Sequence, residues 1–340
     1  MTQASITVLG AGIAGLWQAL TLARRGHRVH LCETAPAATQ FAQAASAYAG
    51  GMLAPYCEEE AAPSIVREMG IEGLKHWRQA YPAARFLGSL VVAQARDAAE
   101  LTRFARMTSG HQRLDGPAIA ALEPGLDGRF GQALYFADEG HVVPREALAY
   151  LLAEVRRAGV DVRLGASTTD AAEAGDWLVD CRGWAARAEL PELRGVRGEM
   201  AIVRTREVAL ARPVRMLHPR FPLYVVPWGD GRYMIGATVI ERDDAGPVTL
   251  RSALELLGAA YAIHPAFGEA EIVELGAGVR PAFPDNIPKL VARGRHLYVN
   301  GMYRHGYLTA PVLARLVADY IATGTADAPP EVFVEDRRER

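Results

Sequence analysis

The fold is decided by the stretch SITVLGAGIAGLWQALTLARRGHRVHLCE, which spans residues 5–33. Its first part, Ser5–Leu9, is an apolar run with the length of a buried strand. A glycine-rich turn follows, then helix-forming residues that stop at Gly26, and then a second strand-like run, Arg28–Glu33. Because a strand–helix–strand crossover is right-handed and leaves its strands parallel, this stretch predicts the opening of a doubly wound α/β sheet.

The glycine-rich turn predicts a bound dinucleotide, because it matches G-x-G-x-x-G between a strand and a helix. Such glycines allow the tight turn, the approach of a pyrophosphate to the helix N-terminus, and close helix–strand packing. Glu33 ends the second strand, where a carboxylate can accept hydrogen bonds from ribose hydroxyls, and an ordinary glycine-rich turn would not need it. The pattern does not separate FAD from NAD, and no second fingerprint occurs, so one dinucleotide is expected. Its expected contacts here are Gly10, Gly12, Ile13, Ala14, Gly15 and Glu33.

Composition points to small-molecule chemistry in a chain of two domains. The 340 residues exceed what one core usually holds, and half of them are hydrophobic. With 37 basic and 39 acidic residues, the chain lacks the positive field that nucleic acid or anionic lipid requires. We expect no secretory leader, no membrane span and no metal site, because neither the apolar runs nor the histidine and cysteine spacings fit one. Three scattered cysteines favour the reducing cytoplasm.

The rest of the chain predicts an α/β layer interrupted twice by a second domain. Strand and helix patterns alternate up to residue 197, whereas β-rich sequence with a Gly229-Asp230-Gly231 hairpin turn follows it. We predict a discontinuous dinucleotide-binding domain over residues 1–85, 140–197 and 276–335, and an antiparallel-sheet substrate domain over 86–139 and 198–275. The acidic residues 58–60 are interpreted as a solvated helix start, and Pro311 as part of the first turn of the last helix.

Motifs along nearly the whole chain resemble the FAD-dependent D-amino-acid oxidase family. They occur in one order, at residues 10–15, 33, 46–52, 178–184, 223–227, 236–238, 279–281 and 301–311. Within that family, residues 49–55, 197–200 and 303–306 are most similar to the glycine oxidases of thiamine biosynthesis. The resemblance implies a Rossmann-type FAD-binding domain with an antiparallel-sheet substrate domain. Because no cysteine follows Cys181, the FAD is expected to be held non-covalently.

The resemblance also implies roles for individual residues. Further FAD contacts are expected at Ser46, Gly50, Gly51, Met52, Val162, Gly183, Arg280, Tyr303, Arg304, His305, Gly306, Tyr307 and Leu308. A bidentate guanidinium can hold a substrate carboxylate, and the match places Arg280 in that role, with Tyr224 and Arg304 beside it.

For several of these residues, a purely structural role stays open at this point. These roles are an ion pair of Arg280 with Asp285, a plain sheet tyrosine at Tyr224, a hydrogen-bonded structural histidine at His305 and a core valine at Val162. Val239 stands where related glycine oxidases carry a larger methionine in the pocket. This difference leaves the pocket volume open.

The activity that the resemblance implies is oxidative deamination of glycine or another small amino acid. The amino acid would become the imino acid and O2 would become hydrogen peroxide, for the synthesis of the thiamine thiazole. Two alternatives stay open, a D-amino-acid or sarcosine dehydrogenase that passes electrons to a carrier, and a flavin subunit of a larger oxidase. The composition also permits a homo-oligomer.

Overall fold

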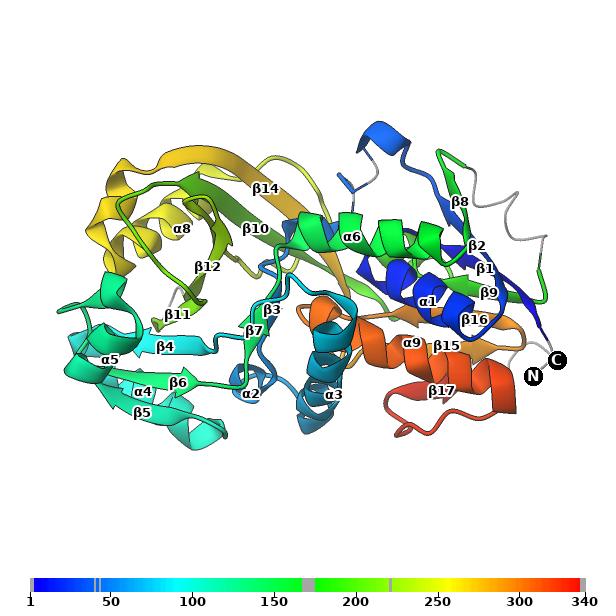
Figure 1. The fold of residues 1–340 in the computed structure, drawn as a ribbon, viewed down its shortest axis with the longest axis horizontal. Coiled ribbons are helices and arrows are strands. Elements are labelled where there is room, and N and C mark those ends of the chain that lie inside the picture. The colour runs from blue at the N-terminus through cyan, green and yellow to red at the C-terminus, as the bar shows by residue number, and fades with distance from the viewer. Residues whose placement is uncertain (1–2, 40, 43, 167–174, 220–221, 337–340) are drawn as a thin grey trace.

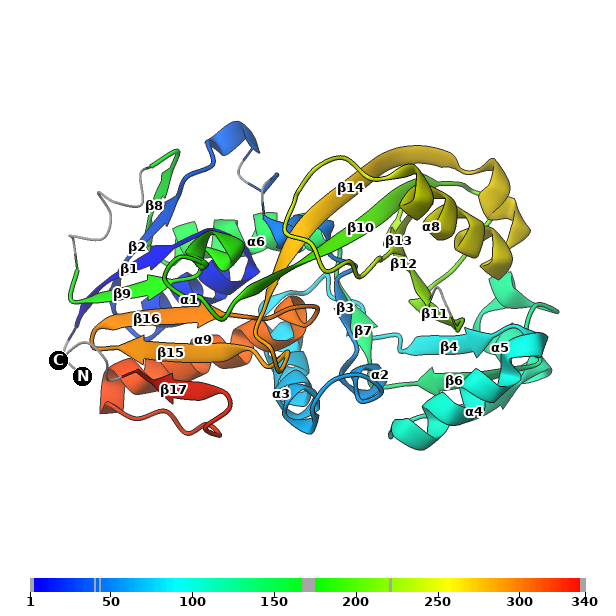
Figure 2. The same cartoon turned by 180° about the vertical axis from the view of Figure 1, so that it is seen from behind.

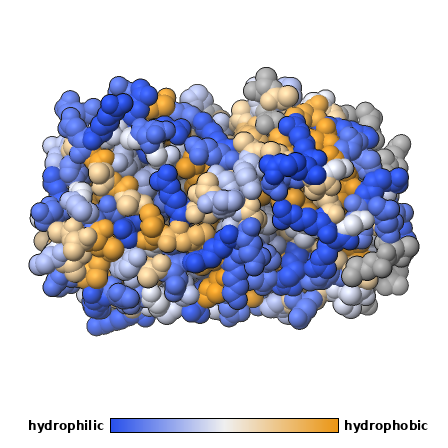
Figure 3. Space-filling view, viewed as in Figure 1, coloured by the Kyte–Doolittle hydropathy of each residue, from blue (hydrophilic) through white to orange (hydrophobic). Residues whose placement is uncertain are grey.

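In the computed structural model the chain forms two large sheets joined by two long strands (Figure 1). The structure describes residues 3–39, 41–42, 44–166, 175–219 and 222–336. No helix among these residues is long and apolar enough to cross a bilayer. On the face drawn in Figure 3, apolar side chains are interspersed with hydrophilic ones.

The first sheet is the predicted doubly wound layer, with strand order β17-β15-β16-β9-β1-β2-β8. Its strands β1 and β2 pair in parallel from Ser5 opposite Arg28, as the sequence predicts, and only β15 and β16 pair antiparallel. Every residue of β1 is buried, which explains why this run is largely apolar, whereas β2 mixes buried apolar residues with more exposed polar ones. The strands are β1 (Ser5–Leu9), β2 (Arg28–Glu33), β8 (Asp161–Leu164), β9 (Trp177–Asp180), β15 (Lys289–Arg293), β16 (His296–Asn300) and β17 (Phe333–Glu335).

Helices α1, α6 and α9 pack together against this sheet, and α3 packs on α9 (Figures 1 and 2). Their core includes Leu16 and Leu20 of α1, neither of which is more than 1% exposed. The last helix begins at Gly306, so Pro311 lies inside it and the prediction that Pro311 belongs to its first turn is wrong. The helices are α1 (Ile13–Arg24), α2 (Pro55–Glu58), α3 (Ser64–Ala80), α6 (Pro144–Arg157) and α9 (Gly306–Thr323).

The second sheet is mostly antiparallel, with order β14-β10-β13-β12-β11-β4-β6-β5. Gly229 and Gly231 have φ of 82° and 70° at the predicted hairpin turn between β12 and β13. Helix α8 (Leu250–Ile263) covers one face, and α4 (Ala98–Met107) and α5 (Gly116–Leu122) pack at the far end (Figure 1). The strands are β4 (Ser89–Ala93), β5 (Gln112–Asp115), β6 (Gln132–Phe136), β10 (Arg194–Arg204), β11 (Val214–Leu217), β12 (Leu223–Gly229), β13 (Arg232–Gly236) and β14 (Glu271–Ala282).

Strands β10 and β14 run from the second sheet toward the first (Figure 2). Their antiparallel pairing extends from Arg194 opposite Ala282 to Arg204 opposite Glu271. Two of the predicted domain boundaries therefore fall inside paired strands, and the division into domains stays a prediction. The short pair β3 (Met52–Leu53) and β7 (Gly140–His141) forms a third, two-stranded sheet.

Candidate active site

A cavity of about 760 Å³ lies where the two large sheets meet. This size is within the range of small-molecule and cofactor sites. It receives the N-termini of α1 and α9 from the first layer, and residues of β10, β12 and β14 from the second. The sequence-predicted residues in its lining are Gly10, Gly12, Ile13, Ala14, Glu33, Ser46, Gly50, Gly51, Met52, Gly183, Tyr224, Arg280, Tyr303, Arg304, His305, Gly306, Tyr307 and Leu308.

The N-terminus of α1 is open toward this cavity. Its N-cap, Gly12, has no capping side chain and the first turn holds no acid, so the positive end of the helix dipole faces the cavity. The Ile13 amide there donates to Oγ of Ser46, another lining residue, at 3.4 Å. Gly10 has φ of 92°, and a Cβ there would stand 2.8 Å from the Cys181 carbonyl oxygen. Gly15 lies outside the lining, but a Cβ on it would stand 1.8 Å from the Gly10 carbonyl oxygen, which explains the third glycine by packing.

Glu33 shapes the turn next to that helix end. Its Oε2 accepts a hydrogen bond from the Ala11 amide at 2.7 Å, and its Oε1 accepts one from the Ala35 amide at 2.9 Å. The carboxylate therefore stands at the end of β2 within the cavity wall, where the sequence places it. Val162 of β8, by contrast, pairs with Leu31 of β2 and lies outside the lining.

A second open helix end, that of α9, lies on the same cavity. His305 is its N-cap without a capping side-chain bond, and the first turn again holds no acid. The preceding Tyr303 has φ of 47°, a left-handed conformation that turns the chain into the helix. The Tyr307 hydroxyl donates to the carbonyl oxygens of Ser46 and Pro144, which fixes the start of α9 against the 3-10 turn η2 (Ala45–Tyr48) and α6.

Arg280 enters the cavity from β14. Its Nη1 donates to the Thr238 carbonyl oxygen at 3.0 Å, and within the described residues no carboxylate pairs with it. Asp285, the alternative partner, is instead bonded to Lys289 at 2.5 Å. Burial, and then the nearby Arg304 charge, lower the pKa of Arg280, but a guanidinium so shifted stays charged. Arg280 is thus a cation that is available to an anionic ligand.

Two glycines make room for the side chains of this wall. A Cβ on Gly198 of β10 would stand 2.0 Å from Nη2 of Arg280, so the guanidinium lies directly over that backbone. The ring of Tyr224 also lies close to Gly50, where a Cβ would stand 2.7 Å from Cε2. Tyr224 therefore packs against the predicted flavin segment and lines the cavity, rather than lying on the sheet away from it.

Glu58 is a cavity residue that the sequence interpretation missed. It ends α2, and its Oε1 is 4.0 Å from Nη2 of Arg304 while its Oε2 is 3.4 Å from Nδ1 of His305. Burial raises the pKa of Glu58, but its neighbours, Arg304 first and then His305 and Arg215, bring it below the ordinary value. The interpretation of residues 58–60 as a solvated helix start is wrong, since Glu58 ends its helix and is largely buried; its position soon after residues 46–52 was the available signal.

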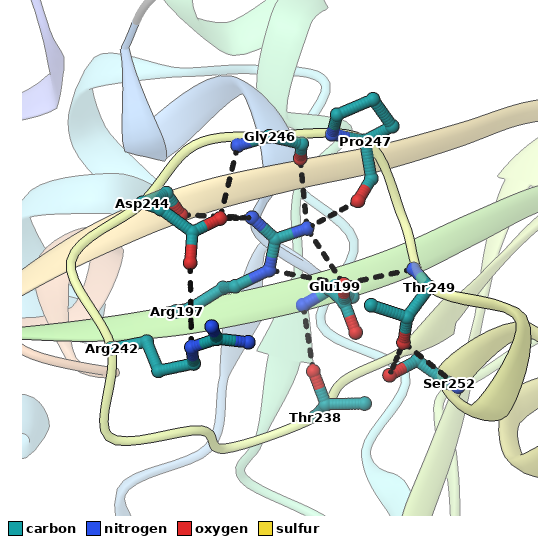
Figure 4. A network of polar contacts seen from close by, with 9 residues as sticks. All are labelled: Arg197, Glu199, Thr238, Arg242, Asp244, Gly246, Pro247, Thr249 and Ser252. Atoms are coloured by element: carbon teal, nitrogen blue, oxygen red, sulfur yellow. Dashed lines mark hydrogen bonds and ion pairs between the residues drawn. The ribbon is translucent and has the colours of Figure 1, made fainter.

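The outer part of the wall is fixed by Arg197 and Glu199 of β10 (Figure 4). Nη2 of Arg197 is 2.7 Å from Oε1 of Glu199, and the side chains are only 3% and 0% exposed. The same guanidinium also donates to Asp244 Oδ1 at 2.6 Å and to the carbonyl oxygens of Gly246 and Pro247. Arg197 therefore holds the connection 237–249 against β10.

That connection contributes to the cavity in two ways. Asp243 and Ala245 line it directly, and Thr238 supplies the carbonyl oxygen that accepts from Arg280. The Glu199 amide in turn donates to the Thr238 hydroxyl at 2.9 Å. Val239 of the same connection is 49% exposed and lies outside the lining, so the valine at this position does not contribute to the cavity wall.

Comparison with known proteins agrees with this arrangement. The sequence profile of the FAD dependent oxidoreductase family (DAO) matches residues 5–320. A Rhizobium etli protein assigned as a thiamine biosynthesis oxidoreductase, ThiO, is 53% identical over 319 residues, which are 94% of this chain and 96% of that one. A glycine oxidase of Pseudomonas aeruginosa is 27% identical, over 93% of this chain and 94% of its own. The glycine oxidase structure of Bacillus cereus superposes with a TM-score of 0.81 at 23% identity, over 99% of this chain and all of that one.

Proposed function

Because the chain belongs to the family of FAD-dependent oxidoreductases, we propose that the cavity holds FAD and oxidises glycine or another small amino acid. The product would be the imino acid, O2 would become hydrogen peroxide, and the imino acid would serve thiamine thiazole synthesis. The 53% identical ThiO and the glycine oxidase relatives support this choice among the activities of the family. The observation that carries it is Arg280, a guanidinium in the cavity wall with no carboxylate partner among the described residues.

The residues present fit FAD. The helix dipole and the uncapped N-terminus of α1 suit the pyrophosphate, and the carboxylate of Glu33 suits ribose hydroxyls. The open end of α9 would lie by the flavin ring, where amides and a helix dipole stabilise negative charge. We assign the flavin segment to Ser46, Gly50, Gly51 and Met52, which line the same cavity. When bound, FAD supplies the acceptor for the two electrons that leave the substrate.

The protein's own task is to position the substrate. Arg280 would bind the carboxylate through its fork of donors, because Gly198 keeps the guanidinium close to β10 and the Thr238 carbonyl fixes one nitrogen. Tyr224 would close the pocket from β12, and within the described residues no hydrogen bond occupies its hydroxyl. Such positioning can account for much of the rate in a reaction whose chemistry belongs to the cofactor.

The setting we propose is the cytoplasm, with a homo-oligomer as an option for assembly. All three cysteines are buried free thiols, which suits a reducing compartment. Burial raises the pKa of the thiols of Cys57 and Cys181 well above the usual value, so neither is a ready nucleophile.

An anaerobic reduction assay tests the proposal. Purified yellow protein should lose its flavin absorbance on mixing with glycine, sarcosine or D-alanine, and regain it quickly with O2. Arg280→Met should keep the flavin but need at least about tenfold more amino acid, because a charged hydrogen bond is worth about 1.5–3 kcal/mol. Arg251→Met, on the exposed surface of α8, is the matched control. Reduction without rapid reoxidation would mean a dehydrogenase, and no reduction by any of these amino acids would mean a flavin subunit.

A further inference from the structure

Two guanidinium groups and one carboxylate meet at the end of the cavity where Tyr224 lies. Arg280 and Arg304 both line this end: the Arg304 charge helps to lower the pKa of Arg280, and Tyr224 raises the pKa of both. Glu58 faces Arg304 at 4.0 Å, a distance that compensates the charge without using up the hydrogen-bond donors of the guanidinium. In the proposed function, Arg280 alone binds the substrate carboxylate, and neither Glu58 nor Arg304 has an assigned role.

The charges at this end of the cavity add up to one. Glu58 is ionised because its pKa lies below the ordinary value, whereas burial, despite the attraction of Glu58, lowers the pKa of His305 and keeps it neutral. Arg215 also acts on Glu58, but it is paired with Glu60 at 2.8 Å. The charges of Arg280, Arg304 and Glu58 add up to a single positive charge, which one substrate carboxylate would neutralise.

We propose that Glu58 is a specificity residue that matches the site to amino acids with one carboxylate and excludes those with two. This inference rests on the proposed function, since it takes Arg280 as the anchor of the first carboxylate. A ligand with a second carboxylate would give the group formed by Arg280, Arg304, Glu58 and the ligand a net negative charge, and would set that carboxylate against Glu58. In a site of low effective dielectric, one unbalanced charge a few Å away costs on the order of 1.4 kcal/mol or more, which is about tenfold in affinity.

The same geometry says what the loss of Glu58 would do. Without its carboxylate, Arg304 becomes a second guanidinium with no anionic partner, and it and Arg280 add two uncompensated positive charges to this end of the cavity. A dicarboxylate then finds one cation for each of its ends. Glu58 thus distinguishes glycine and its N-methyl derivative from an amine that bears two acetate arms.

The test uses two ligands that cannot be oxidised as amines, methoxyacetate and oxydiacetate. They differ by one carboxylate, and their dissociation constants from the flavin-loaded protein are measured by titration calorimetry, which does not depend on turnover. Wild-type protein should bind methoxyacetate at least about tenfold more tightly than oxydiacetate. Glu58→Gln should reduce that ratio by about tenfold or more. Glu59→Gln removes a charge from the same acidic run at a residue that is paired with Arg67, and should leave the ratio unchanged.

Two further variants complete the charge series. Arg304→Gln leaves Arg280 and Glu58 to cancel, so both ligands should bind about tenfold more weakly. The double variant Glu58→Gln, Arg304→Gln restores a single positive charge and should recover the preference for methoxyacetate. A Glu58→Gln ratio within twofold of wild type overturns the inference. If that variant does not fold, undiminished methoxyacetate binding by Arg304→Gln overturns it equally. Wild-type protein that binds neither ligand would instead remove the carboxylate role of Arg280, and with it the proposed function.

Discussion

Replacement of Gly198 by alanine should displace Arg280 while leaving the fold intact. The new Cβ would stand 2.0 Å from Nη2, 2.2 Å from Cζ and 2.6 Å from Nη1 of Arg280, all well inside van der Waals contact. Gly198 lies in β10 without a left-handed φ, so alanine fits the backbone. The obstructing atoms are the end of a flexible side chain, and the strain is therefore relieved by moving the guanidinium rather than the strands.

The displacement has a predictable size in kinetics. Loss of a charge-assisted, two-donor contact to a carboxylate is worth about 1.5–3 kcal/mol, which raises the apparent substrate constant about 10- to 150-fold. The flavin should stay bound, because the open ends of α1 and α9 are untouched. Steady-state peroxide production across glycine concentrations, together with flavin absorbance and a thermal melt, measures all three quantities.

Gly258→Ala is the matched control for this variant. Gly258 lies on α8, and a Cβ there meets nothing within 4 Å, so the same chemical change adds helix propensity of about 0.5–1 kcal/mol and alters no kinetic constant. The reasoning is refuted if Gly198→Ala changes the substrate constant less than twofold, or if it lowers the melting temperature so far that the whole fold has responded.

Two other predictions concern buried charges. Burial, opposed by hydrogen bonds from Ser89 and Cys57, raises the pKa of Glu139 from 4.5 to about 7. The folded state therefore favours the protonated carboxyl, and the stability that this adds is fully present below pH 4.5 and is lost as the pH rises through 7. Urea titrations of wild type and Glu139→Gln should diverge by about 3 kcal/mol over that window in favour of the variant, and a pH-independent difference would contradict the assignment. Arg197→Met should lower the free energy of unfolding by about 3–5 kcal/mol, because it leaves the buried carboxylate of Glu199 without its charged partner. Arg204→Met, in an exposed ion pair, should change the free energy of unfolding by less than about 1 kcal/mol. Equal effects of the two variants would argue against the buried network.

The parts of the site that the sequence predicts are those fixed by local geometry. The turn at Gly10 needs a left-handed φ, and the approach of Gly15 to the Gly10 carbonyl needs a missing Cβ, so the glycine pattern records the strand–turn–helix directly. Glu33 follows because the end of a paired parallel strand lies beside that turn. Arg280 was placed by resemblance, and spacing alone would not have distinguished it from a surface arginine.

The parts that could not be predicted depend on contacts between distant segments. Glu58 belongs to an acidic run that looks like a helix start, and only the packing of α2 against the start of α9 shows that it faces Arg304 and His305. Val239 was singled out by resemblance, and only the structure shows that it follows the end of β13 at Gly236 and lies outside the cavity. In both cases the position in the sequence left the environment of the side chain open, and tertiary packing determined it.

The placement of Arg280 follows from main-chain pairing more than from its own side-chain contacts. Val196 of β10 lies opposite Arg280 of β14, so the guanidinium extends along the strand toward Gly198 and ends on the Thr238 carbonyl. The connection that carries Thr238 is held to β10 by Arg197. The contacts that orient Arg280 thus all depend on strand β10, and β10 also extends toward the first sheet. A cut at residue 197 would divide this strand between two domains and would separate Arg197 from Gly198, both of which help to place Arg280.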